Sequence, residues 1–198
     1  VNSSRGLGFQ QRSGSGVWHA IAFENVTIDA TRYPTGSNWW SSGEPIWMTS
    51  VAQSAADAPL TGTVRDITFK NIVARGENGV LLSGGAVAPM SGLVFDNVSI
   101  TVGVYGNTSC AKGAPHTTPT GCRDYRPRSE GAVVLSPTSV FAFEGNGSAT
   151  LRDVTARFDG PAADYWLPPA EGGLCRQLGG GWRLTQEGRT RLPCVRKT

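Results

Sequence analysis

The chain has 198 residues, of which 39% are hydrophobic and 17% are charged, and its formal net charge is +3. This length favours a single domain, and the hydrophobic share is sufficient for a buried core. The 26 glycines and the few charged residues argue against a helical bundle and favour short strands joined by tight turns. The small net charge does not indicate a nucleic-acid partner, and no run of about 18 apolar residues predicts a membrane span.

The first residues already have the pattern of a strand. The chain begins at Val1, and residues 5–9 alternate like a strand that enters a turn. The basic and apolar pattern of a signal peptide is absent before them. We therefore expect the sequence to begin inside a longer pattern, through processing or truncation.

One pattern recurs along the chain. Its form is apolar, any residue, Phe or Leu, a charged residue, Asn, Val or Ile, any residue, apolar. Apolar residues alternate on each side of the charged-Asn pair, which predicts two short strands joined at a corner. Asn suits that corner because it tolerates the left-handed conformation, and stacked copies could form an Asn ladder. The copies are residues 19–28, 65–74, 91–100 and, in degenerate form, 149–156.

The spacing of the corners predicts a solenoid. Asn25, Asn71, Asn97 and Asp153 follow one another at intervals of 46, 26 and 56 residues. We interpret these intervals as multiples of one coil of roughly 23 to 28 residues, with two coils and an insertion in the last. The segments between them, which read as buried strands of less regular coils, are 44–50, 79–84 and 131–135. The alternative is a β-sandwich whose strands are similar by accident.

The repeated segments resemble a known family. Those that carry the resemblance are 23–26, 43–46, 64–72, 74–84 and 124–127. They are similar to the carboxy-terminal half of the polygalacturonase-like glycoside hydrolases, which act on pectin. The resemblance covers about residues 5–160 and implies an all-β, right-handed parallel β-helix that is N-terminally incomplete. It places β-helix coils in residues 1–160, with a cysteine-loop insertion at 103–128.

The resemblance also bears on catalysis. The family hydrolyses O-glycosidic bonds with inversion, which requires carboxylates roughly 6.5–9.5 Å apart. Its acids come from Asn-Thr-Asp, Asp-Asp and Gly-His-Gly segments, and this chain contains none of the three. We therefore predict no catalytic residue here, expect the catalytic carboxylates upstream, and expect the chain alone to be inactive.

A further family element is a basic strand that binds the substrate carboxylate. Residues 5–12 take its place, which makes Arg5, Gln10 and Arg12 the predicted substrate-binding residues. Arginine can bind a uronate carboxylate bidentately. Gln10 stands where the family has a cation, so a neutral or differently charged pectic chain becomes plausible. The alternative for Arg5 and Arg12 is an ordinary surface position.

The four cysteines indicate disulfide bonds. Local pairing of Cys110 with Cys122 and of Cys175 with Cys194 is favoured among three connectivities. An even count in Gly-rich segments suits an oxidising compartment. The second pair lies in the Pro- and Gly-rich segment 161–198, which we expect to form an irregular, disulfide-linked C-terminal cap. No Cys-x-x-Cys occurs, and neither histidine has the spacing of a zinc ligand to a cysteine pair, so we predict no metal site and no cofactor.

Five glycosylation sequons favour secretion to the cell wall or another extracellular location. We interpret Asn25 and Asn97 as structural, because they lie inside the repeat, and favour Asn107 and Asn146 as acceptors. All five sequons begin at Asn2, Asn25, Asn97, Asn107 and Asn146.

Glu44 and Glu77 are the best candidates for buried carboxylates, and we expect them to bind loop backbone. Trp39 and Trp40 could bind sugar or cap an edge, whereas we expect Trp47 to point into the core. Scattered acidic residues disfavour a calcium-dependent lyase.

Two functions remain: part of a pectin-type hydrolase, or a non-catalytic carbohydrate-binding or structural β-helix. The expected partner is a polysaccharide, with no nucleic acid, no membrane and a monomeric chain.

Overall fold

The structure is a computed structural model that describes residues 5–11, 13–31, 43–50, 62–85, 88–103, 105, 141–145, 147–159, 175–178 and 183–186. These residues form ten strands and no helix, so none of them belongs to a helix that could cross a membrane. The strands are β1 (Arg5–Gln11), β2 (Val17–Thr31), β3 (Glu44–Ser50), β4 (Thr63–Gly76), β5 (Val80–Gly84), β6 (Met90–Val102), β7 (Phe141–Gly145), β8 (Gly147–Phe158), β9 (Cys175–Leu178) and β10 (Arg183–Gln186).

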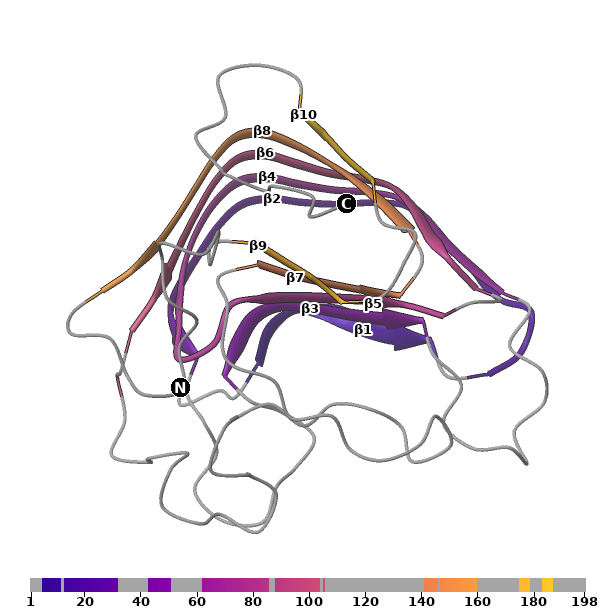
Figure 1. Ribbon diagram of the computed structural model, residues 1–198, viewed down its shortest axis with the longest axis horizontal. Coiled ribbons are helices and arrows are strands. Elements are labelled where there is room, and N and C mark those ends of the chain that lie inside the picture. Colours follow the sequence, from indigo (N-terminus) through magenta and orange to yellow (C-terminus); the bar gives the residue numbers. More distant parts are fainter. Residues whose placement is uncertain are drawn as a thin grey trace, which may run out of the picture.

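The strands form two parallel sheets that face each other (Figure 1). The odd sheet has the order β1-β3-β5-β7-β9, and the even sheet has the order β2-β4-β6-β8-β10. Every adjacent pair is parallel, so the chain passes alternately from one sheet to the other. The expectation of an all-β fold with parallel strands is confirmed.

The number of coils inferred from the corner spacing is wrong. β2, β4, β6 and β8 are direct neighbours, although their corners are 46, 26 and 56 residues apart. Each interval is therefore one step along the even sheet, and the steps differ only in the length of the connection. The segments 44–50 and 79–84 contain buried strands, as expected, but these strands, β3 and β5, belong to the odd sheet and add no step to the even sheet. Residues 131–135 lie outside the described part.

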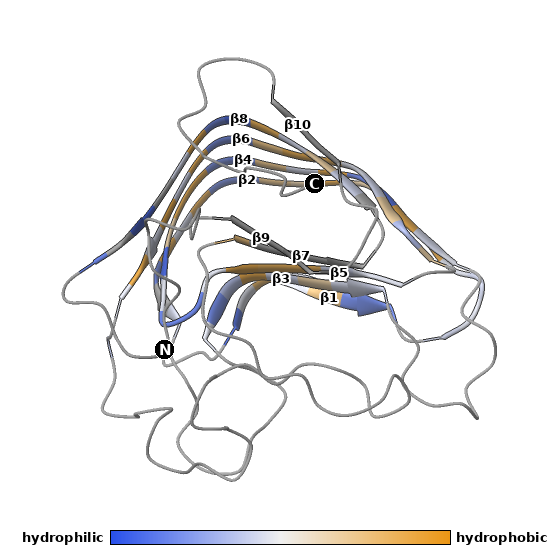
Figure 2. Cartoon of the chain, viewed as in Figure 1, coloured by the Kyte–Doolittle hydropathy of each residue, from blue (hydrophilic) through white to orange (hydrophobic). Residues whose placement is uncertain are grey.

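The alternation of apolar residues places the core between the two sheets. Hydrophobic positions recur side by side across the even strands (Figure 2). Phe23, Phe69 and Phe95 stack along one column, with ring centroids 5.1 and 4.8 Å apart. Phe95 then meets Phe141 of the odd sheet edge to face, at 5.6 Å. Aromatic contacts of this kind stabilise beyond the area they bury.

The predicted Asn corners are present. Asn25, Asn71 and Asn97 have φ of 58°, 54° and 53°, and Asp153 has φ of 47°. The Nδ2 of Asn71 donates to the Oδ1 of Asn25, and the Nδ2 of Asn97 donates to the Oδ1 of Asn71, each at 2.9 Å. The expectation of an Asn ladder is confirmed. Each corner lies inside one continuous strand rather than between two strands.

A second column of left-handed residues lies five positions before the Asn corners. Ala20, Asp66 and Gly92 have φ of 54°, 56° and 62°. A Cβ on Gly92 would lie 2.6 Å from the side-chain Oδ1 of Asp66, which would have to move, and the positive φ there favours glycine. The even strands are therefore bent at two places, and the sequence pattern had indicated only one.

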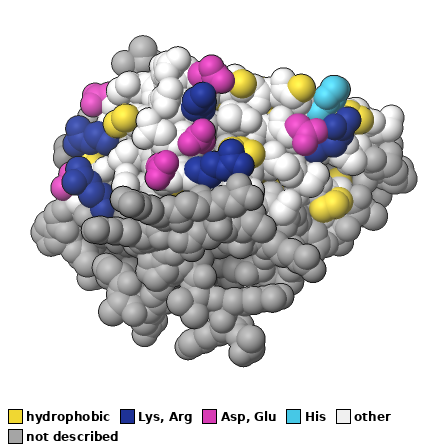
Figure 3. All heavy atoms as spheres, turned by 90° about the horizontal axis from the view of Figure 1, so that it is seen from above, with side chains coloured by type: hydrophobic (Ala, Val, Ile, Leu, Met, Phe, Trp, Pro, Cys, Tyr) yellow, Lys and Arg dark blue, Asp and Glu magenta, His cyan; other side chains and the backbone are white. Residues whose placement is uncertain are grey.

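Charged side chains alternate in sign across the outer face of the even sheet. Glu24 is opposite Lys70, Lys70 is opposite Asp96, and Asp96 is opposite Arg152. The space-filling view onto this sheet shows side chains of both signs on its surface (Figure 3). Opposite charges in facing positions stabilise one register, because a shift of the strands would disturb the whole row.

The carboxy-terminal segment contributes to both sheets. β9 pairs with β7, and β10 pairs with β8, each in parallel. The segment expected to form an irregular cap therefore contains two regular strands that extend the sheets.

Candidate functional site

The predicted substrate strand is β1, which lies at one end of the odd sheet among the described strands. Its first residue, Arg5, is in register with Glu44 of β3. The Arg5 Nε lies 3.6 Å from the Glu44 Oε2, and the Arg5 Cζ lies 3.7 Å from the centroid of the Trp47 ring. We call these three residues the Arg5 cluster. It combines an ion pair with a cation–π contact.

The Arg5 cluster is largely shielded from water. The Glu44 side chain is 0% exposed and the Arg5 side chain is 24% exposed. Burial lowers the pKa of the Arg5 guanidinium, and the charge and hydrogen bond of Glu44 oppose that shift. An ordinary surface position is therefore wrong for Arg5, which is held between a carboxylate and an aromatic ring.

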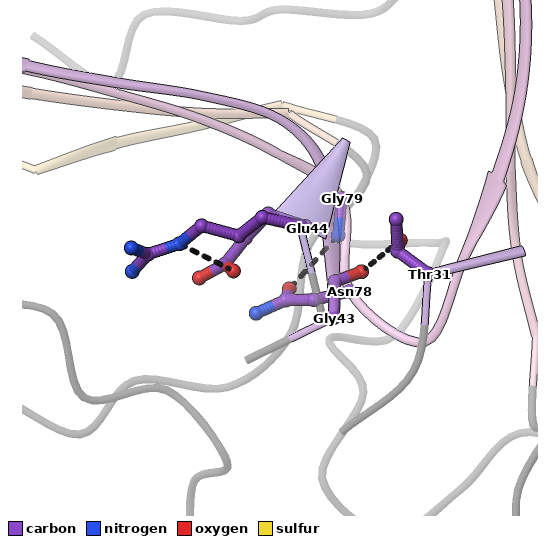
Figure 4. A network of polar contacts seen from close by, with 6 residues as sticks. Thr31, Gly43, Glu44, Asn78 and Gly79 are labelled. Atoms are coloured by element: carbon purple, nitrogen blue, oxygen red, sulfur yellow. Dashed lines mark hydrogen bonds and ion pairs between the residues drawn. The ribbon is translucent and has the colours of Figure 1, made fainter. Parts of the chain in front are cut away.

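Hydrogen bonds from the last residue of β2 and from the segment after β4 hold the start of β3 beside this cluster (Figure 4). The Thr31 Oγ1 donates to the carbonyl of Gly43 at 2.6 Å, and the amide of Asn78 donates to the same carbonyl at 3.2 Å. The amide of Gly79 donates to the Asn78 Oδ1 at 2.9 Å. Glu44 therefore follows a residue whose backbone is held by the ends of β2 and β4.

Glu77 has a structural role near the same end of the molecule. It is 1% exposed, and its Oε1 accepts a hydrogen bond from the backbone amide of Tyr105 at 2.8 Å. The expectation that Glu77 binds loop backbone is confirmed. The Tyr105 ring in turn lies 4.5 Å from the guanidinium of Arg75, and the Arg75 Nη1 lies 3.7 Å from the Asp29 Oδ1.

The outer face of the odd sheet carries polar side chains in one row. Gln10, Thr49 and Ser83 are in register on β1, β3 and β5. Gln10 is partly exposed, Thr49 is fully buried and Ser83 is buried. The Thr49 Oγ1 has no hydrogen-bond partner among the described residues, which is an unusual state for a buried hydroxyl.

Trp47 lies on this outer face and not in the main core. It packs with Leu81, whereas its neighbours Ile46 and Met48 belong to the core cluster between the sheets. The expectation that Trp47 points into that core is wrong. Its Nε1 is buried and, within the described part of the chain, has no hydrogen-bond partner. Gly8 is in register with Trp47, and a Cβ there would lie 1.6 Å from the Trp47 carbonyl oxygen.

Several predicted residues lie outside the described part of the chain. Arg12 is one of them, as are the segment 124–127 and the tryptophans Trp39 and Trp40. Cys175 begins β9, and the two predicted disulfides lie outside the side chains that the structure describes. The remaining predicted residues outside the described part are Cys110, Cys122, Cys194, Asn107 and Asn146.

Two of the sequon asparagines belong to the Asn ladder. The Oδ1 of Asn25 accepts a hydrogen bond from Asn71, and the Nδ2 of Asn97 donates one to Asn71, which agrees with a structural interpretation of both. Within the described residues, no three His, Cys, Asp or Glu side chains gather where they could hold a metal ion.

Comparison with known proteins finds no match for this chain: no family model, no curated protein and no solved structure is similar to it.

Proposed function

We propose that this chain is part of a secreted, polygalacturonase-like glycoside hydrolase with a right-handed parallel β-helix. The observation that carries the proposal is the alternation of strands between two parallel sheets, with an Asn ladder at the corner. Connections between parallel strands of one sheet are right-handed in about 98% of cases, which gives the proposed hand. Two of the motifs that resemble the family, residues 23–26 and 64–72, lie within β2 and β4, and residues 124–127 are outside the described part of the chain.

The proposed glycan-binding surface is the outer face of the odd sheet at β1. Gln10 is partly exposed there, whereas Thr49 and Ser83 in the same row are buried, so Gln10 is the residue of this row proposed to contact a glycan. An amide offers both a donor and an acceptor, which suits sugar hydroxyl groups. The cation of Arg5 is already engaged by Glu44 and the Trp47 ring. These contacts favour a pectic polysaccharide with neutral sugars over a purely anionic polygalacturonate.

The proposed catalytic carboxylates belong to upstream coils and not to this chain. Glu44 and Glu77 are buried, and they contact Arg5 and the Tyr105 amide respectively. A general acid or base must reach the glycosidic oxygen or the attacking water. Neither carboxylate is placed for such a task, so this chain would supply the wall of the substrate groove.

The engagement of Glu44 and Glu77 in internal contacts also favours a second candidate function. A β-helix that holds a polysaccharide without hydrolysing it would use the same outer face and would need no exposed carboxylate pair. The two candidates differ in activity and not in glycan binding.

The test is glycan binding by the 198-residue chain, measured by calorimetry and by affinity electrophoresis. The probes are arabinan, galactan, rhamnogalacturonan and polygalacturonate. We expect retention by the neutral or mixed polymers and a loss of affinity in Gln10→Ala. Lys70→Ala, on the outer face of the other sheet, is the control and should bind normally. A failure to bind all four polymers would overturn the proposal, and release of reducing sugar by the chain would overturn the assignment of the acids to upstream coils.

A further inference from the structure

The end of the molecule formed by β1 and β2 exposes side chains of core type. Both strands are terminal in their sheets among the described strands. We call this surface the β1–β2 face, and it presents the apolar side chains of Leu7, Phe9, Trp18, Ile21, Phe23, Val26 and Ile28. The register partners of these seven residues on β3 and β4 are all 0–1% exposed.

Trp18 shows most clearly how much more exposed this face is than the neighbouring strands. Trp18 is 41% exposed, whereas Val64, its register partner on β4, is 0% exposed. One face of the Trp18 ring is covered by Phe9, with centroids 4.8 Å apart and planes within 8°. The column of side chains to which Trp18 belongs is therefore buried at β4, and its Trp18 end is exposed to solvent. Exposed apolar surface that is continuous over two strands indicates an interaction site.

The hydrogen bonds of the Asn ladder run in one direction. Each asparagine donates its Nδ2 to the Oδ1 of the asparagine on the preceding strand. Asn25 is the last acceptor in this series. Continuation in the same direction requires an oxygen acceptor opposite the Nδ2 of Asn25, at a corner of the same left-handed conformation. Asparagine and aspartate meet both conditions.

The charged row on the outer face adds a second requirement. The signs alternate from Arg152 through Asp96 and Lys70 to Glu24. Glu24 is exposed on the terminal strand, so the position opposite it on the open side calls for a cation. Because like charges directly opposite each other destabilise a strand pair, Glu or Asp is disfavoured there.

We propose that the β1–β2 face binds one further rung, meaning a pair of parallel strands that extends both sheets. Its even-sheet strand carries Asn or Asp at the corner, Lys or Arg just before it, and apolar side chains facing inward. The inference rests on the stacked architecture of the proposed function and not on its carbohydrate chemistry. A second copy does not meet these requirements, because two identical faces related by a twofold axis run antiparallel or place their apolar columns on opposite sides.

The test supplies such a strand and measures its docking. A copy of residues 63–76, which has this pattern with Lys70 and Asn71, is joined ahead of Val1 by a Gly/Ser linker. The matched control joins the same segment with Phe69→Ser, Lys70→Glu and Asn71→Ala introduced in the copy. Hydrogen exchange is followed at the amides of β2, and fluorescence reports Trp18, with Trp18→Phe as the reference.

We expect exchange at β2 to slow by about tenfold or more with the matching segment only, together with a blue shift of the Trp18 emission. Equal protection by both segments, or by neither, would overturn the proposal. Sedimentation of the unmodified chain provides a third outcome: a stable dimer with a protected β2 would assign the face to a second copy and also overturn it. Because none of these measurements uses a glycan, failure here is distinguishable from failure of the proposed function.

Discussion

β2 and β4 have the same sequence pattern and the same bends, but they differ in burial. The inward residues Ile67, Phe69 and Ile72 of β4 are 0% exposed, whereas those of β2 in the same columns are only partly buried. Among the described strands, β4 lies between two even strands, and β2 has a neighbour on one side only. An apolar side chain in this fold is therefore buried by the next strand along the stack as much as by the opposite sheet.

The comparison of β2 with β4 predicts that the largest losses of stability come from substitutions in the stacked column of Phe23, Phe69 and Phe95. Phe69→Ala should lower the free energy of unfolding by about 4 kcal/mol, because it leaves a cavity between two stacked rings. Phe23→Ala should cost about 2 kcal/mol, since Phe23 is only partly buried and has one stacked neighbour. Urea denaturation of both variants checks this. Equal losses would mean that position in the stack does not determine burial energy.

The Arg5 cluster predicts the next largest effect. Glu44→Ala should cost about 3 kcal/mol, because it leaves the Arg5 guanidinium shielded from water without its carboxylate. Glu24→Ala, an exposed glutamate on β2, is the control and should change stability by less than about 0.5 kcal/mol.

A double variant tests the cause of the Glu44 effect. Arg5→Met with Glu44→Leu should recover most of the stability, since an apolar pair of similar volume replaces a buried ion pair at little cost. Thermal unfolding is the measurement. A double variant as unstable as Glu44→Ala would show that packing around Trp47, and not the buried charge, causes the loss.

The Asn ladder predicts a smaller difference between the same two strands. Asn71→Ala should cost about 2 kcal/mol, because it removes two ladder hydrogen bonds and forces alanine into the left-handed conformation. Asn25→Ala removes one such bond and should cost less. Asn71→Gly separates the two causes, since glycine adopts this φ without strain. A larger loss of stability in Asn25→Ala than in Asn71→Ala would show that the hydrogen bonds of the Asn ladder do not determine the effect.

The charged row predicts the smallest effect. Lys70→Glu places like charges opposite Glu24 and Asp96 and should cost about 1 kcal/mol at low salt. Salt should reduce this cost because the row is exposed. Denaturation midpoints at low and high salt provide the measurement, with Lys70→Gln as the uncharged control. A cost that does not change with salt would point to lost packing of the lysine stem.

The corners and core columns could be predicted from the sequence because their causes are local. Alternation of apolar residues determines which side chains share a face, and asparagine signals the left-handed corner. The second left-handed column could not be predicted, because Ala20, Asp66 and Gly92 share no residue type.

Two other errors have causes beyond local sequence. Every residue of β3 is buried, so alternation could not reveal that Trp47 faces away from the core. The intervals between corners do not distinguish one long connection from two coils, so only the strand pairing could give the number of steps. The pairing of Arg5 with Glu44 likewise depends on the register of β1 with β3, two strands that are 39 positions apart at this pair.

The unequal intervals between corners have a consequence for how such a chain can change. Steps of 46, 26 and 56 residues all lead to the neighbouring strand of the even sheet, in matching columns. Doubling a connection costs only about 0.6 kcal/mol in closure entropy. Strand register and connection length are thus independent variables. Insertions and deletions between rungs can alter the surface that the molecule presents while the sheets keep their alignment.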